Sequence, residues 1–157
     1  MGGGEARPTG GEPPAVDVDR GRPDELDAVL ALLTAAGLPR EGVAEHFGYF
    51  LVARANGRVV GAVGMEPYGA AALLRSLVVA PEHRGCGLGR ALAERLLDEA
   101  RARDVARVFL LTETAADFFA RLGLERIGRE DADPAVGASV EFQSACPRSA
   151  ACMRLGL

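Results

Sequence analysis

The most informative part of the chain is residues 73–92, which read L-L-R-S-L-V-V-A-P-E-H-R-G-C-G-L-G-R-A-L. An apolar strand is predicted to end before Pro81, because proline lacks the N–H that a β ladder needs. Three glycines within 85–89 then lead into an amphipathic helix and leave its first backbone amides uncovered by side chains. Orphan amides and the helix dipole favour an anion at such a position. With Arg84 and Arg90 on either side, the stretch predicts a phosphate-binding loop.

Other glycine-loop motifs do not fit this stretch. The dinucleotide-binding pattern G-x-G-x-x-G, started at Gly85, needs a glycine where the chain has Arg90. A P-loop needs a lysine, and all 18 Lys and Arg residues of this chain are arginine. The same absence excludes Schiff-base and pyridoxal-phosphate mechanisms. The two histidines, His46 and His83, lack the spacing of a zinc-protease helix. The remaining alternative is a tight turn that only starts a helix.

The composition is that of a soluble protein with one domain. Of 157 residues, 48% are hydrophobic and 25% are charged, and the net charge is −4. Arginines scattered among acids do not predict a nucleic-acid surface, and no apolar run reaches the ~18 residues of a membrane span. Three cysteines without framework spacing indicate reduced thiols and a cytoplasmic protein. Residues 1–14, rich in glycine and proline, predict a disordered leader before a domain over 15–157.

Hydrophobic periodicity and turn signals predict strands and helices that form a mixed α+β sheet. The strongest short-range signal is Asn56-Gly57 between two apolar runs, because this pair favours a tight hairpin turn. Thr114 is predicted to cap a helix that Gly123 ends. The expected strands cover 15–19, 49–53, 58–65, 73–79, 105–111, 124–129 and 150–155, and the expected helices cover 23–37, 40–47, 87–103, 114–122 and 133–145.

These motifs resemble the GNAT superfamily of N-acetyltransferases. The segment V-V-A-P-E-H-R-G-C-G-L-G-R-A-L is similar to its acetyl-CoA-binding signature Q/R-x-x-G-x-G/A, here Arg84, Gly87 and Gly89. The block F-F-A-R-L-G-L at 118–124 resembles the family's F-Y-x-x-x-G-F, and the likeness covers roughly the whole predicted domain. The tail S-V-E-F-Q-S-A-C-P-R-S-A-A-C-M, at 139–153, resembles small acetyltransferases associated with arsenic resistance.

The resemblance implies an α/β/α sandwich with a mixed, mostly antiparallel sheet that splays into a V between its fourth and fifth strands. It implies acetyl-CoA as co-substrate, no metal, a small-molecule amine as acceptor, and a homodimer, which relatives often form. Pantetheine would pair with the fourth strand, the diphosphate would lie on the glycine loop, and an amide near Leu77 would polarise the thioester carbonyl. The implied cofactor-binding residues are Leu77, Val78, Val79, Arg84, Gly85, Cys86, Gly87, Leu88, Gly89, Arg90 and Phe119.

Four residues near the implied acyl-transfer point are candidates for catalysis. Glu66, at the end of the third strand, is the candidate general base, and its alternative role is a solvated acid. Phe119 stands where many relatives have the tyrosine that protonates the leaving thiolate, so Tyr68 or water would supply that proton. Arg75 and Ser76 are expected on opposite faces of their strand. Arg75 either clamps an acidic group of the substrate or pairs internally with Glu66 or another acid.

The resulting expectation is a cytoplasmic, acetyl-CoA-dependent N-acetyltransferase that acts on a small amino-acid-like amine, with organoarsenicals among the candidates. Cys146 and Cys152 suggest a site for trivalent arsenic, although small buried side chains are the simpler interpretation. Two other functions remain open. One is a general amino-acid or antibiotic acetyltransferase, and the other is a sensor module that binds acyl-CoA without turnover.

Overall fold

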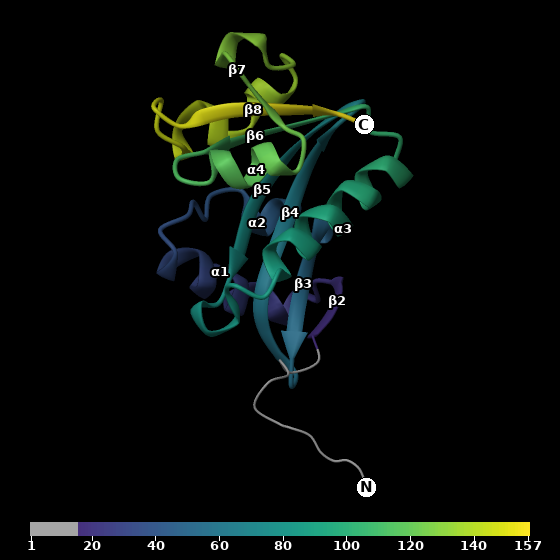
Figure 1. Ribbon diagram of the computed structural model, residues 1–157, viewed down its shortest axis with the longest axis vertical. Helices are drawn as coiled ribbons and strands as arrows, with labels where there is room; N and C mark the ends of the chain where they lie inside the picture. Colours follow the sequence, from purple (N-terminus) through teal and green to yellow (C-terminus); the bar gives the residue numbers. More distant parts are fainter. Residues whose placement is uncertain (1–15) are drawn as a thin grey trace, which may run out of the picture.

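The computed structural model describes residues 16–157, so the predicted leader and Ala15 lie outside the described residues. Within this range one mixed sheet has the strand order β2-β3-β4-β5-β6-β8-β7 (Figure 1). Its neighbouring strands are antiparallel except β5 and β6, which are parallel. The strands are β2 (Val16–Arg20), β3 (Phe50–Ala55), β4 (Arg58–Tyr68), β5 (Ala71–Val79), β6 (Arg107–Thr112), β7 (Glu125–Ile127) and β8 (Ala151–Gly156).

The sheet opens between β5 and β6, the fourth and fifth strands of the described chain. These two strands pair only from Ala71 opposite Arg107 to Leu73 opposite Phe109, although β5 continues to Val79. On the far side, β6 pairs with the C-terminal strand β8 along its whole length. The predicted V-shaped splay is therefore confirmed, and it leaves one edge of the second half of β5 without a neighbouring strand among the described residues.

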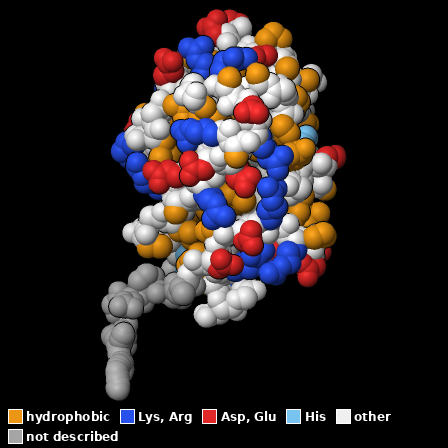
Figure 2. All heavy atoms as spheres, turned by 90° about the vertical axis from the view of Figure 1, so that its right-hand side faces the viewer, with side chains coloured by type: hydrophobic (Ala, Val, Ile, Leu, Met, Phe, Trp, Pro, Cys, Tyr) orange, Lys and Arg blue, Asp and Glu red, His pale blue; other side chains and the backbone are white. Residues whose placement is uncertain are grey.

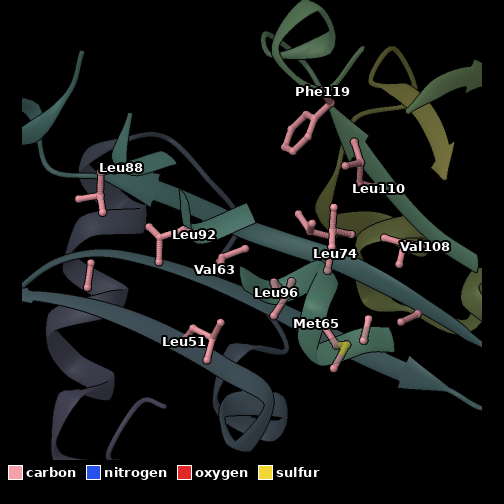
Figure 3. Close-up of a cluster of buried hydrophobic side chains, with 14 of the residues drawn as sticks. Leu51, Val63, Met65, Leu74, Leu88, Leu92, Leu96, Val108, Leu110 and Phe119 are labelled. Carbon is pink, nitrogen blue, oxygen red and sulfur yellow. The ribbon is translucent and has the colours of Figure 1, made fainter. Parts of the chain in front are cut away.

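Helices cover both faces of the sheet, because successive strand residues point to opposite sides. On β3, Leu51 belongs to the core cluster beneath α3, whereas Phe50 belongs to the cluster beneath α1. Figure 3 shows the first cluster, in which Leu92 and Leu96 of α3 point toward the strands. The expected α/β/α sandwich is thus present. The α-helices are α1 (Leu26–Ala35), α2 (Val43–His46), α3 (Leu88–Ala102) and α4 (Ala116–Arg121).

The hairpin that joins β3 and β4 is confirmed as predicted. Asn56 and Gly57 have φ values of 55° and 77°, the left-handed region that a tight two-residue turn requires. The turn aligns Ala55 with Arg58 and sets the register that carries β4 across the sheet to Tyr68. The remaining expected strands and helices occur with ends shifted by a few residues, apart from one segment near the C-terminus.

That segment, residues 133–145, is not the amphipathic helix that the sequence predicts. It contains a 3₁₀ turn at Val136–Ala138 and a separate π-helical turn at Glu141–Ala145. Between them Ser139 is extended, and its Oγ accepts a hydrogen bond from the backbone N–H of Glu141 at 3.2 Å. The serine side chain therefore takes a donor that a continuous helix would bond to the backbone.

The prediction that Thr114 caps the helix after β6, which is α4, is also wrong. No side chain of the described chain caps α4, whose N-cap is Ala115. Instead, Thr112 Oγ1 accepts a hydrogen bond from the Ala115 amide at 3.0 Å, so the hydroxyl that orders this turn lies at the end of β6. Within residues 16–157, no helix combines the length and apolarity that a membrane crossing requires.

Candidate active site

A cavity of about 350 Å³ lies where β5 and β6 diverge. This volume is within the usual range for small-molecule sites. One wall is the second half of β5, the opposite wall is the end of β6, and further residues come from the loop after α1 and from the segment 141–150. The lining includes Leu77, Val78, Val79, Arg84, Phe119, Arg75 and Ser76, which the sequence assigned to the site.

A β-bulge in β5 shapes the cavity wall at Ser76 and Leu77. The register pairs Ala62 with Val78 but Gly64 with Arg75, so two residues of β5 oppose one residue of β4. Ser76 has a φ of 63°, which is uncommon for a residue with a side chain. A bulge interrupts the ladder and redirects the strand. The amide predicted to polarise the thioester carbonyl, near Leu77, therefore lies at a break in the ladder beside the cavity.

The same bulge makes one expectation wrong. Arg75 and Ser76 were expected on opposite faces of the strand, yet Arg75 Nε donates a hydrogen bond to Ser76 Oγ at 3.0 Å. Both residues line the cavity. The strict alternation of side chains holds only for regular strand geometry, and the positive φ of Ser76 ends that regularity.

The glycine loop after β5 has the geometry of an anion site. Gly87 is the N-cap of α3, and it is left-handed with a φ of 86°. No side chain of the described chain caps this helix, so the amides of its first turn are free for an external acceptor. A Cβ at Gly85 or Gly87 would meet no protein atom within 4 Å, so the loop surface is open.

The two arginines that flank the loop are held differently. Arg84 Nε donates to the carbonyl of Val79 at 2.9 Å, which fastens the loop to the end of β5. Arg90 Nε lies 3.0 Å from Glu94 Oε2 in an exposed i,i+4 pair on α3. Gly89 lies close to the same strand end, since a Cβ there would be 3.7 Å from Val79 Cγ2. The loop and the cavity are thus joined through Val79.

Arg75 is the centre of a buried ionic cluster behind the bulge. Its Nη1 lies 2.7 Å from Glu66 Oε2, and its Nη2 lies 3.3 Å from Glu141 Oε2 and 3.4 Å from the carbonyl oxygen of Pro39. The Arg75 side chain is 0% exposed. Of the two roles that the sequence left open for Arg75, the structure contains the internal pair.

Glu66 and Tyr68 lie side by side at the end of β4, behind Arg75. The Tyr68 hydroxyl donates to Glu66 Oε1 at 2.5 Å, and His46 Nδ1 lies 3.7 Å from Glu66 Oε2. Neither Glu66 nor Tyr68 is among the residues that line the cavity. With its side chain 1% exposed, Glu66 is not a solvated acid at a strand end.

Comparison with known proteins identifies the family to which this arrangement belongs. Residues 21–124 match the model of the acetyltransferase (GNAT) family. The chain belongs to this family. It is 40% identical over 109 residues to the IAA acetyltransferase of Azospirillum brasilense, a match that covers 66% of this chain and 70% of that protein.

Two further GNAT comparisons differ in how much of each protein is aligned. The uncharacterized N-acetyltransferase CT2212 of Chlorobaculum tepidum is 36% identical over 91 residues, 57% of this chain and 58% of that one. The Rv2747 protein of Mycobacterium tuberculosis, crystallised in complex with CoA, superposes with a TM-score of 0.75 and 25% identity over 90% of this chain and 99% of that one.

The N-acetylglutamate synthase of Neisseria gonorrhoeae, crystallised with coenzyme A and N-acetyl-glutamate, shares the GNAT fold. It superposes with a TM-score of 0.78 and 17% identity. That match covers 93% of this chain but 36% of the synthase. The chain thus spans about a third of the synthase and 58% of the Chlorobaculum relative.

The protonation states of the acids in and behind the cavity differ from one residue to the next. Burial alone would raise the pKa of Glu66, but hydrogen bonds from Tyr68 and Arg75 outweigh it and hold that pKa below its ordinary value. Burial and the bond to Glu66 raise the pKa of Tyr68 to about 12. Burial raises the pKa of Glu141 to about 7, although Arg75 acts in the opposite direction. Glu66 is therefore a stable carboxylate, whereas Glu141 can change its charge near neutral pH.

Glu141 is the site residue that sequence reasoning missed. It stands in the tail segment 139–153, to whose acid the sequence analysis gave no role. The available signal was a single acid two residues after Ser139, in a stretch otherwise free of charge from Pro134 up to Arg148. Glu141 lies beside Arg75 because of the path that the chain takes from β7 back to the sheet. The local sequence does not reveal that path.

The three cysteines are free thiols in different surroundings. Cys86 is exposed on the glycine loop, where its Sγ donates to the carbonyl of His83 at 2.9 Å. Cys146 lines the cavity, and burial together with the charge of Glu141 raises its pKa to about 12. Burial also raises the pKa of Cys152 on β8. Across residues 16–157, no group of three His, Cys, Asp or Glu side chains is arranged to hold a metal ion.

Proposed function

We propose that this protein transfers the acetyl group of acetyl-CoA to the nitrogen of a small amine. One observation carries the proposal: the cavity at the β5–β6 opening is joined through Val79 to the uncapped, glycine-lined N-terminus of α3. A long cofactor with an anionic diphosphate at one end and a thioester at the other matches such a continuous surface.

The backbone of β5 supports the placement of the pantetheine arm. Beyond Leu73, the edge of β5 that faces β6 has no strand partner in the described chain. Peptide-like groups can add to such an edge as an extra strand. We place the arm along Leu77–Val79, the diphosphate on the amides of 85–90, and the ring of Phe119 against the cofactor, since this side chain also lines the cavity.

The chemistry that fits this placement is direct transfer without an acyl-enzyme. The neutral amine attacks the thioester carbon, and the carbonyl oxygen gains negative charge that the amide near Leu77 stabilises. The carbon–sulfur bond then breaks as the amide bond forms. Of the two protons that the acceptor ammonium loses, one reaches the CoA thiolate and the other leaves through a base.

The acceptor class that we propose is amino acids and amino-acid-like toxic compounds, organoarsenicals included. One support is the resemblance of residues 139–153 to small arsenic-resistance acetyltransferases, since Glu141, Cys146 and Ala150 of this segment line the cavity. The other is the presence of Arg75 in the same wall. Because the guanidinium is already bonded to Glu66, a substrate carboxylate would have to take the place of Glu141 on Nη2.

We place this activity in the cytoplasm and expect it to act on small molecules. The free thiols of Cys86, Cys146 and Cys152 favour a reducing compartment. Figure 2 shows arginine and acidic side chains interspersed on one face. Among the described residues, exposed arginines also pair with acids, as Arg20 does with Glu99. This mixture does not favour a nucleic-acid partner. A homodimer remains a prediction from the family resemblance.

The experiment is a thiol-release assay with acetyl-CoA and a panel of amines, together with calorimetric titration of acetyl-CoA. The panel pairs each amino acid with its decarboxylated amine and includes an organoarsenical amino acid. Turnover of amino acids well above that of their decarboxylated partners supports the proposed acceptor class. Binding without turnover on any amine would indicate a sensor instead, and absence of acetyl-CoA binding would contradict both functions.

A further inference from the structure

We infer that Glu141 is the general base that removes a proton from the acceptor ammonium. The inference rests on the proposed acetyl transfer. It assigns to Glu141 the role of general base, for which the sequence analysis named Glu66. It follows from a comparison of where the two carboxylates lie and what already occupies them.

Glu141 is on the cavity wall, and Glu66 is not. Glu141 lines the same cavity as Ser76 and Leu77, the residues of the bulge at which the thioester carbonyl is placed. Its side chain is 4% exposed, so it is almost entirely shielded from bulk water. Glu66 is separated from the cavity by Arg75, whose Nη1 bonds one of its oxygens while Tyr68 bonds the other. An ammonium in the cavity therefore meets Glu141 first.

The position of Glu141 is fixed by its own turn. Its backbone N–H donates to Ser139 Oγ at 3.2 Å, and its carbonyl accepts from the Cys146 amide at 3.1 Å. On the inner side, Oε2 lies 3.3 Å from Arg75 Nη2. These contacts hold the carboxyl at the wall without the close bidentate geometry that would keep it permanently ionised.

The charges that face Glu141 give it a proton affinity suited to this task. Burial and the negative charges of Glu66 and Glu41 favour the protonated form, whereas Arg75 favours the carboxylate, as does a hydrogen bond from Cys146. The balance lies at a pKa of about 7. A base is most effective when its pKa is near the working pH, because it is then both available and able to hold a proton.

The proton balance of the step is complete. The Glu141 carboxylate takes one proton from R–NH3⁺ and leaves the lone pair of R–NH2 free to attack the thioester carbon. The nitrogen then loses a second proton, which ends on the CoA sulfur as the carbon–sulfur bond breaks. Glu141 returns the first proton to solvent when the products leave.

The experiment compares the pH dependence of kcat/KM for wild type, Glu141→Gln and Glu141→Asp with one amine that wild type acetylates. Wild-type kcat/KM is expected to rise with pH along a limb centred near 7. Glu141→Gln is expected to lose that limb and about 100-fold or more of the activity at pH 8, and Glu141→Asp to recover part of both. Affinity for acetyl-CoA should stay within about 2-fold in each variant, since Glu141 is not in the diphosphate loop. Glu45→Gln, an exposed acid on α2, is the matched control and should retain the full profile.

Two outcomes would overturn the role of Glu141. One is a Glu141→Gln enzyme that keeps the ascending limb and most of its activity. The other concerns the infrared difference spectrum between pH 5.5 and pH 8.5. The role of Glu141 is overturned if the wild-type spectrum has no protonated-carboxyl band that disappears in Glu141→Gln. The infrared measurement does not need turnover, so it tests the titration of Glu141 even if no amine is acetylated. Failure of every amine would contradict the proposed function, whereas a missing infrared signal would contradict the titration of Glu141 that its role as a base requires.

Discussion

Glu66 and Arg75 form a salt bridge of 2.7 Å between Oε2 and Nη1, with both side chains removed from solvent on the neighbouring strands β4 and β5. Glu141 adds a second carboxylate to the same guanidinium at 3.3 Å. Two acids therefore share one cation inside the protein. Breaking a buried pair leaves uncompensated charge, so this cluster is a point at which stability and chemistry are coupled.

Replacement of the shared cation should destabilise the fold strongly. Arg75→Met keeps much of the side-chain volume but leaves Glu66 and Glu141 unpaired, and we expect the free energy of unfolding to fall by about 3–5 kcal/mol. Urea unfolding at pH 7.5 measures this loss. Arg101→Ala, which removes an exposed i,i+3 pair with Asp98, is the control and should change stability by less than about 1 kcal/mol. A loss of similar size in both variants would contradict the importance of the buried cluster.

Stability should also fall as the pH rises from about 4.5 to about 7, because of Glu141. The folded pKa of about 7 lies above the ordinary value of 4.5, so the folded state keeps a proton that the unfolded chain has released. The stabilisation is fully present below about pH 4.5 and is lost by about pH 7, with a size of up to about 3 kcal/mol.

Glu141→Gln carries no titrating group at this position and should lack the pH-dependent loss. At pH 8 this variant should unfold at a higher urea concentration than wild type, whereas at pH 5 the two should differ little. Unfolding curves at the two pH values measure the difference. A parallel shift of wild type and variant between pH 5 and pH 8 would show that Glu141 is not the group responsible.

The glycine loop can be tested with two glycines of similar backbone geometry. Gly87 in the loop and Gly57 in the β3–β4 hairpin have φ values of 86° and 77°, and a Cβ at either position meets no protein atom within 4 Å. Gly87→Val and Gly57→Val should therefore lose similar stability, about 1–2 kcal/mol each. Only Gly87→Val should weaken acetyl-CoA binding, by at least about 10-fold in calorimetric titration, because its side chain occupies the surface proposed for the diphosphate. Equal affinity of the two variants would refute the loop assignment.

The cysteines should react with a thiol reagent at separate rates. Cys86 is exposed, whereas burial raises the pKa of Cys146 and that of Cys152 and keeps both as thiols. Since the thiolate is the reactive form, we expect one fast phase in the native protein at pH 8, and Cys86→Ser should remove it. Fast labelling that persists in Cys86→Ser would mean that the buried thiols are accessible, and it would strengthen the hypothesis of an arsenic site.

Much of the fold could be predicted because its signals are local. The hairpin follows from Asn56-Gly57, since the left-handed φ values of that turn select these residues. The start of α3 follows from the glycines after Pro81, and its buried face follows from leucines one turn apart. The helix expected over 133–145 failed for a reason visible in one residue, because Ser139 hydrogen-bonds the backbone in place of the next turn.

In the candidate site, too, the features with local sequence signals could be predicted and the others could not. A local motif located the phosphate loop, since the glycines, the helix start and both arginines lie within a few residues of one another. The bulge was not predicted, because a positive φ at Ser76 depends on how β5 is paired with β4 and has no strong signature in a serine. Because no bulge was predicted, Arg75 and Ser76 were expected on opposite faces of the strand.

The sequence alone determined the class of fold, the loop expected to bind a diphosphate, and the chemistries that a chain without lysine cannot perform. Those conclusions depend on residue types and short spacings, which the printed order of residues states directly. Only the tertiary structure decided which acid faces the cavity. Glu66 and Glu141 are far apart in the chain, and the segment that holds Glu141 connects β7 to β8, whose places in the sheet bring it against Arg75. Long-range pairing sets both the burial and the charge of that carboxyl, and no local pattern encodes either.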